Sequence, residues 1–144
     1  MLASKISCLL VLSLAFLLGA LLVVPSQGQS WAAFKNKHID SKSQYPPHNV
    51  NLYCENQMRN RRMTSPRCKS HNTFIYAPAS IVQQVCQNVS GPTAITSTVS
   101  FDLVDCRYTG GSPPNSCNYQ GRIFTKYIVV TCVNYVPVHF IRFH

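Results

Sequence analysis

The chain has 144 residues, of which 46% are hydrophobic, and a formal net charge of +9 at pH 7. Its length, with no internal repeat or low-complexity stretch, excludes a repeat protein and a second domain. The positive charge favours polyanionic partners such as nucleic acid, heparin-like sugars or anionic membrane, although it also fits a charge that only keeps a secreted protein soluble.

The first 28 residues predict a secretory signal peptide. Lys5 precedes an apolar run over residues 6–24, and residues 25–28 supply a proline and small residues at cleavage-like spacing. A membrane anchor is the alternative, because the run approaches spanning length. No basic flank follows the run, so we expect residues 1–28 to be removed and residues 29–144 to form the secreted domain.

Six cysteines remain after the signal peptide: Cys54, Cys68, Cys86, Cys106, Cys117 and Cys132. An even number in a small secreted chain predicts three disulfides, whose pairing the spacing alone leaves open. A zinc site is the alternative, but no pair of these cysteines has the C-x₂₋₄-C spacing of structural zinc sites. We therefore expect neither a metal nor another cofactor.

The first predicted element of the secreted domain is a short amphipathic helix over residues 31–39. Trp31, Phe34 and His38 are separated by three and four residues, so a helix places them on one face. Residues 41–51 contain Tyr-Pro-Pro and are typical of an extended loop.

A second helix is predicted over residues 52–63, with Cys54 and Met58 on one face. It ends before a proline, because the residue preceding proline avoids the helical region. Its exposed side is expected to carry a basic cluster: Arg59, Arg61 and Arg62. This cluster is either a polyanion-binding patch or an ordinary solvated helix face.

A third short helix is predicted over residues 78–86, with a proline in its first turn. Segments rich in β-branched and aromatic residues predict strands over residues 72–77, 96–108, 119–125, 127–134 and 136–143. Helices followed by antiparallel strands predict an α+β domain. Asn88 begins an Asn-Val-Ser sequence, which is an N-glycosylation sequon.

Three residues would form a metal-independent site for RNA cleavage if they converged: His38, Lys69 and His139. Two imidazoles titrate near neutral pH, so one can act as a base while the other acts as an acid. A lysine between them can stabilise negative charge on phosphorus. The nucleophile would be the 2′-hydroxyl of RNA, which DNA lacks. The alternative gives all three residues structural or solvated roles.

The chain resembles the pancreatic-type ribonuclease superfamily, or ribonuclease A family, over essentially all of residues 29–144. Three motifs carry the resemblance: Phe-Lys-Asn-Lys-His ending at His38, Cys-Lys-x-x-Asn-Thr-Phe over residues 68–74, and Val-Pro-Val-His-Phe over residues 136–140. It implies a ribonuclease A-like fold with three short helices and a strongly bent antiparallel sheet. It also implies the disulfides Cys54–Cys106, Cys68–Cys117 and Cys86–Cys132.

The resemblance further implies the roles of individual residues. His38 would be the general base and His139 the general acid, with the roles exchanged when the 2′,3′-cyclic phosphate is hydrolysed. Lys69 would stabilise the transition state, assisted by the backbone N–H of Phe140. The implied substrate-binding residues are Lys37, Asn72, Thr73, Asp105 and Phe140. Among them, Thr73 would read the pyrimidine edge and Asp105 would brace its hydroxyl.

The chain departs from the family pattern near the predicted site. Ile141 replaces the aspartate that usually orients the acid histidine, so we expect reduced efficiency rather than lost activity. The short segment before Cys106 and the presence of Val133 leave the preference for the base after the cleaved bond open. Lys37 is similar to the onconase-like members, whereas Arg59–Arg62 and the Gly-Gly-Ser-Pro-Pro turn are similar to the angiogenin-like members.

We therefore predict a secreted endoribonuclease that cleaves single-stranded RNA on the 3′ side of pyrimidines. The alternative is a cationic host-defence or angiogenin-like signalling protein with weak ribonuclease activity. The expected partners are single-stranded RNA and, through the positive charge, anionic cell-surface polysaccharide or membrane. We expect a monomer.

Overall fold

The computed structural model describes residues 29–144, so the predicted signal peptide over residues 1–28 lies outside the described residues. The helices are α2 (Trp31–His38), α3 (Val50–Asn60) and α4 (Ala79–Gln83), the last followed by a 3₁₀ turn, η1 (Gln84–Cys86). The strands are β1 (Ile39–Asp40), β2 (His71–Tyr76), β3 (Thr93–Thr96), β4 (Phe101–Gly110), β5 (Asn118–Lys126), β6 (Ile128–Val133) and β7 (Val136–Phe143). Within this part of the chain, no helix is long and apolar enough to cross a membrane.

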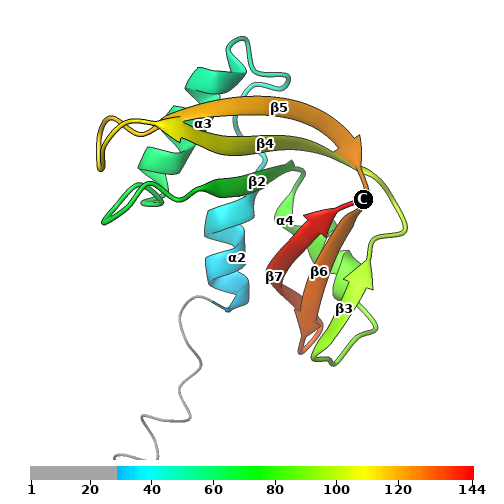
Figure 1. Cartoon of the computed structure of the whole chain (residues 1–144). Coiled ribbons are helices and arrows are strands. Elements are labelled where there is room, and N and C mark those ends of the chain that lie inside the picture. The colour runs from blue at the N-terminus through cyan, green and yellow to red at the C-terminus, as the bar shows by residue number, and fades with distance from the viewer. Residues whose placement is uncertain (1–28) are drawn as a thin grey trace, which may run out of the picture.

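The strands form two sheets, with orders β1-β2-β4-β5 and β3-β6-β7. Neighbouring strands are antiparallel except for the short β1, which pairs parallel to β2. Figure 1 shows β4 and β5 as long curved strands that arch over α2, with β6 and β7 below their far end. Helix α2 contacts both β2 and β7 and therefore connects the two sheets. The predicted α+β class is confirmed.

The single strand predicted over residues 96–108 is confirmed for residues 101–108, but residues 97–100 are not part of a strand. The segment is divided into β3 and β4, which belong to different sheets. Buried Ser97 causes the break, because its hydroxyl accepts a hydrogen bond from Ile128 N at 3.0 Å and donates one to Val99 O at 2.7 Å. Such side-chain bonds to the backbone compete with a regular ladder. The β-forming Thr and Val around Ser97 hid this break in the sequence.

Helices α2 and α3 begin at side-chain caps. Ser30 Oγ accepts from Ala33 N, and Asn49 Oδ1 accepts from Leu52 N, each at 3.0 Å. These caps satisfy backbone N–H groups that have no partner within the helix. The Asn49 cap explains why α3 begins two residues earlier than the predicted 52–63.

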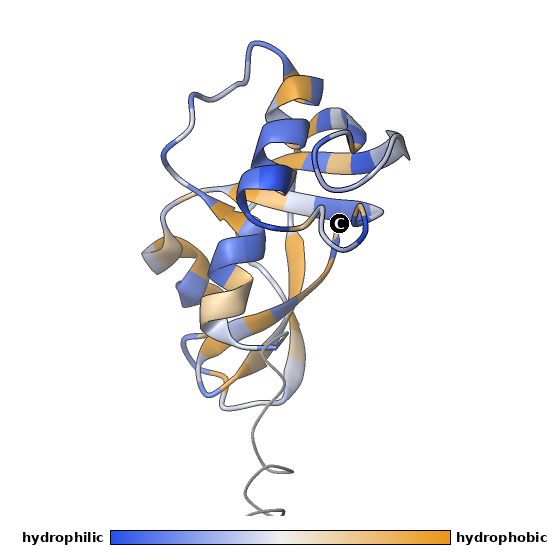
Figure 2. Ribbon diagram, turned by 90° about the vertical axis from the view of Figure 1, so that its left-hand side faces the viewer, coloured by the Kyte–Doolittle hydropathy of each residue, from blue (hydrophilic) through white to orange (hydrophobic). Residues whose placement is uncertain are grey.

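The core has two parts, one around α2 and the second sheet and one between α3 and the β4–β5 pair. Hydrophobic and hydrophilic stretches alternate along the helices and strands that surround them (Figure 2). The disulfides are Cys54–Cys106, Cys68–Cys117 and Cys86–Cys132, the pairs that the resemblance implies.

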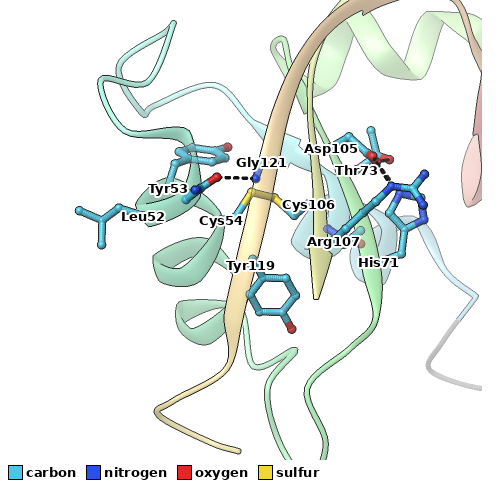
Figure 3. The surroundings of a disulfide bond; sticks show 12 residues. Leu52, Tyr53, Cys54, His71, Thr73, Asp105, Cys106, Arg107, Tyr119 and Gly121 are labelled. Atoms are coloured by element: carbon cyan, nitrogen blue, oxygen red, sulfur yellow. Dashed lines mark hydrogen bonds and ion pairs between the residues drawn. A yellow bond between two sulfur atoms is a disulfide. The ribbon is translucent and has the colours of Figure 1, made fainter. Parts of the chain in front are cut away.

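Helix α3 packs unusually close to β5. A Cβ atom added at Gly121 would lie 2.6 Å from Val50 O and 2.9 Å from Cys54 Sγ. Figure 3 shows this glycine beside the Cys54–Cys106 disulfide that ties α3 to β4. Only a residue without a side chain allows this approach.

Arg61 does not belong to an exposed basic cluster, so that part of the sequence prediction is wrong. Its Nη1 donates to Asn36 O at 2.8 Å and to Ile39 O at 2.7 Å, at the C-terminal end of α2. Its guanidinium also lies over the Phe74 ring, 5.1 Å from the centroid. The planar guanidinium thus joins the end of α2 to β2. Arg59 and Arg62 are exposed.

We expect Arg61→Ala to lower the free energy of unfolding by about 2 kcal/mol, because it leaves carbonyl groups at the end of α2 without their charged donor. Arg59→Ala is the matched control. Arg59 is exposed and donates only to Asn56, so its removal should cost less than about 0.5 kcal/mol. Urea unfolding of the two oxidised variants measures the difference. Equal losses would contradict this role of Arg61.

Candidate active site

A cleft of about 410 Å³ lies where α2, β2 and β7 meet. All three residues of the predicted catalytic trio, His38, Lys69 and His139, line it. They come from the end of α2, the loop before β2 and the middle of β7. The other lining residues are Phe34, Lys37, His71, Asn72, Thr73, Arg107, Val138, Phe140, Ile141, Arg142 and Phe143.

His38 is buried, with 8% of its surface exposed. Its Nδ1 is 2.8 Å from Thr73 O, and its ring is stacked against Phe140 with centroids 5.2 Å apart. Because the backbone carbonyl only accepts, Nδ1 carries the hydrogen and Nε2 is left as the basic atom of the neutral ring. The ring is therefore held in one tautomer.

Burial lowers the pKa of His38 from 6.5 to about 3, although the hydrogen bond to Thr73 opposes this shift. The nearby charges of Lys69, Lys37 and His139 lower it further. His38 is therefore uncharged at neutral pH and ready to accept a proton. His139 lines the same cleft as His38.

A chain of hydrogen bonds holds Lys69 at the cleft. Lys69 Nζ donates to Asn72 Oδ1 at 2.9 Å, and Asn72 Nδ2 donates to Lys37 O at 2.7 Å. The neighbouring Cys68–Cys117 disulfide and a hydrogen bond from Tyr119 to Lys69 O anchor the backbone. Burial, and to a lesser extent the charge of Lys37, lowers the pKa of Lys69. An anion in the cleft would relieve this repulsion.

His139 is exposed on β7, opposite Thr131 of β6. Within residues 29–144, no side chain holds its imidazole by a hydrogen bond. Ile141, two residues later, lines the same cleft and is 38% exposed. As the sequence analysis predicted, the position beside His139 carries an apolar side chain in place of an orienting carboxylate.

Thr73 and Asp105 face each other across β2 and β4. Both are almost fully buried, and Thr73 Oγ1 donates to Asp105 Oδ1 at 2.9 Å. Phe140 packs on the His38 ring at the same cleft. These three residues provide a flat apolar surface and a polar edge beside the imidazoles, which suits a planar heterocycle.

Two further residues at this edge, His71 and Arg107, were not predicted. His71 Nε2 contacts Asp105 Oδ1, and Arg107 Nε donates to Asp105 Oδ2 at 3.2 Å. In Figure 3 these side chains lie together with Thr73 and Asp105, on the side of β4 away from α3. The period-two alternation of a strand puts His71 on the same face as Thr73, but only the β2–β4 register brings both to Asp105.

The arrangement can bind an anion and move protons around it. One neutral imidazole, a second imidazole and a partly buried ammonium group share one cleft. Within residues 29–144, no three His, Cys, Asp or Glu side chains gather as metal ligands. The sequon residue Asn88 is exposed after η1, outside this cleft.

Comparisons with known proteins give a consistent result. The family model described as pancreatic ribonuclease matches residues 29–141. The pancreatic ribonuclease of Iguana iguana is 44% identical over 120 residues, which cover 78% of this chain and 96% of that protein. Angiogenin of Mus musculus is 34% identical over 135 residues and 90% of each chain. Green turtle egg white ribonuclease superposes with a TM-score of 0.69 at 35% identity, covering 79% of this chain and 98% of that structure.

The lowered pKa of His38 predicts a pH-dependent stability. Between about 3, its folded pKa, and 6.5, its ordinary value, the unfolded chain binds a proton at this residue that the folded chain does not. His38 therefore destabilises the folded state increasingly as the pH falls from 6.5 towards 3. The stability of His38→Asn relative to wild type should rise by about 1 kcal/mol for each pH unit lowered in this window. Urea unfolding at several pH values measures this, and a constant difference would contradict it.

Proposed function

Since the chain belongs to the pancreatic ribonuclease family, we propose that it is an endoribonuclease that cleaves single-stranded RNA on the 3′ side of pyrimidines. The observation that carries the proposal is the single cleft lined by His38, Lys69 and His139. Family membership supports RNA cleavage in general. The His/His mechanism, its independence of metal and the pyrimidine preference are our proposals.

In the first step, Nε2 of neutral His38 accepts the proton of the 2′-hydroxyl. The 2′-oxygen then forms a bond to phosphorus, and the bond from phosphorus to the 5′-oxygen breaks. Protonated His139 donates its proton to the departing 5′-oxygen, which leaves as an alcohol. The products are a 2′,3′-cyclic phosphate and a new 5′-hydroxyl end.

In the second step, water replaces the alcohol and the two histidines exchange roles. His139 accepts a proton from water, whose oxygen attacks phosphorus, and His38 returns its proton to the 2′-oxygen as the ring opens. The product is a 3′-phosphate. Both histidines then have their starting protonation states.

Charge stabilisation is assigned to Lys69 and to the backbone N–H of Phe140. The nonbridging oxygens gain negative charge as phosphorus becomes five-coordinate, and a partly buried ammonium group stabilises this charge. The same phosphate offsets the positive charges that lower the pKa of His38, so the base strengthens when substrate binds. Lys37 and Asn72 support Lys69 and the phosphate.

The proposed base site lies between Phe140 and Thr73. The Phe140 ring offers a stacking surface, and the backbone N–H and hydroxyl of Thr73 address the edge of the base. Asp105, 2.9 Å from that hydroxyl, braces it. The one-ring width of a pyrimidine would place the ribose beside His38.

We also propose that the protein acts outside the cell as a monomer. The predicted signal peptide and the three disulfides support secretion, because disulfides persist in oxidising compartments. The exposed Asn88 is available for N-glycosylation.

The second candidate function is a cationic host-defence or signalling protein with weak ribonuclease activity. The exposed Arg59 and Arg62 favour it, as does the similarity to proteins named angiogenin. Because the Arg61 guanidinium is hydrogen-bonded to the end of α2, the basic cluster contains fewer exposed charges than the sequence suggests. Binding to anionic cell-surface polysaccharide or membrane would use these side chains.

We expect His139→Ala to lower kcat for cleavage of a pyrimidine–adenosine dinucleotide by about 10²- to 10⁴-fold, because the leaving oxygen loses its proton donor. The control is His48→Ala, since His48 is exposed, bonded to Gln44 and outside the cleft. Unchanged turnover in the purified His139 variant would overturn the mechanism. A cell response retained by the same variant would make the second candidate the primary function.

We expect Ile141→Asp to raise kcat by up to about tenfold, because the new carboxylate can accept a hydrogen bond from His139 and fix its tautomer. Ile123→Asp is the matched control, since Ile123 is similarly exposed at 43% but does not line the cleft. Dinucleotide cleavage under saturating substrate measures both. An equal change of kcat in the two variants would assign the effect to net charge. An unchanged kcat in Ile141→Asp would contradict the expectation that a carboxylate at position 141 improves catalysis by His139.

A further inference from the structure

We propose that His71 sets the balance between cytidine and uridine at the base site by supplying a second donor to Asp105 Oδ1. The proposal rests on the proposed function and extends it to a residue outside the predicted site. His71 does not touch the reacting atoms. It is a positioning residue that acts on the base through Asp105 and Thr73.

The sheet register places these groups together. Thr73 pairs with Asp105 across β2 and β4, and His71 pairs with Arg107. Because side chains two residues apart on a strand share a face, His71 lies next to Thr73 and diagonal to Asp105. Figure 3 shows the four side chains grouped at this edge.

The two oxygens of Asp105 have different partners. Oδ2 accepts from Arg107 Nε at 3.2 Å. Oδ1 accepts from the Thr73 hydroxyl at 2.9 Å and from His71 Nε2. A carboxylate has no hydrogen to give, so both neighbours of Oδ1 must donate to it. Asp105 is 2% exposed, and water offers little substitute for a lost donor.

The Thr73 hydroxyl has one hydrogen, and the two pyrimidines require it in different places. Uracil carries a hydrogen on N3, so the hydroxyl accepts from the base and continues to donate to Asp105. Cytosine has a lone pair on N3, so the hydroxyl must donate to the base and leaves Oδ1. Cytidine binding therefore removes one donor from a buried carboxylate oxygen, which carries a cost.

His71 reduces that cost. With its Nε2–H in place, Oδ1 keeps a donor after the Thr73 hydroxyl turns to cytosine. Sharing Oδ1 between two donors also weakens the bond that holds the Thr73 hydroxyl in the uridine arrangement. Both effects favour cytidine. A chain without a donor at position 71 would leave Oδ1 unpaired and would prefer uridine.

The test compares kcat/KM for cytidylyl-adenosine and uridylyl-adenosine in wild type and His71→Val. Valine suits the half-exposed strand position, so the variant should fold. The ratio of cytidine to uridine kcat/KM should fall by about three- to tenfold, since a charge-assisted hydrogen bond is involved. His71→Gln, which retains an N–H donor, should restore part of the ratio. A merely structural change at His71 would lower both values together and leave the ratio unchanged, which would overturn the proposal.

Two further measurements separate this inference from the proposed function. In an Asp105→Asn background, His71→Val should change the ratio by less than about twofold, and a full effect there would show that His71 acts by another route. If wild type cleaves neither dinucleotide, the proposed function fails. The inference is then tested by the affinities for cytidine and uridine 3′-phosphate, whose ratio should still fall in His71→Val, and an unchanged ratio would overturn it.

Discussion

The hydrogen bond between His38 Nδ1 and Thr73 O connects the two halves of the candidate site. One partner ends α2, and the other lies in the middle of β2. The bond selects the tautomer of the His38 imidazole. It also fixes the distance between His38, the proposed general base, and Thr73, which would read the pyrimidine. The proposed cleavage chemistry and the proposed base selection therefore both depend on this one hydrogen bond. The packing of α2 against β2 and β7 and the hydrogen bonds of Arg61 at the end of α2 support this arrangement.

Positive charge in the cleft has opposite consequences for binding and for proton transfer. Lys37, Lys69 and His139 all lower the pKa of His38, after burial itself. The same charges attract the phosphate backbone of RNA. The positive charges in the cleft repel one another. A bound phosphate would offset this repulsion and would raise the pKa of His38. Substrate binding therefore prepares the residue that is proposed to start the reaction.

Local sequence patterns predicted the helices, most of the strands and the motifs of the site. They did not predict the contacts that depend on how distant strands pair. The amphipathic spacing of Trp31, Phe34 and His38 gave the correct helix face, and three specific motifs located the residues that meet in the cleft. The strand predicted over 96–108 begins only at residue 101, because Ser97 bonds to β6, a contact that no local pattern reveals. His71 was missed for the same reason, since its partner Asp105 is 34 residues away.

The run from Arg59 to Arg62 has an evolutionary consequence. The three arginines appear equivalent in the sequence. In the structure, Arg61 is hydrogen-bonded to the end of α2, whereas Arg59 and Arg62 are exposed to solvent. The two exposed positions can drift to neutral or acidic residues at little cost in stability, so affinity for polyanions is free to change between relatives. Arg61 is constrained by its hydrogen bonds to the end of α2 and its contact with Phe74. An arginine kept at this position in related chains is therefore explained by the geometry of α2 without selection for a charged surface.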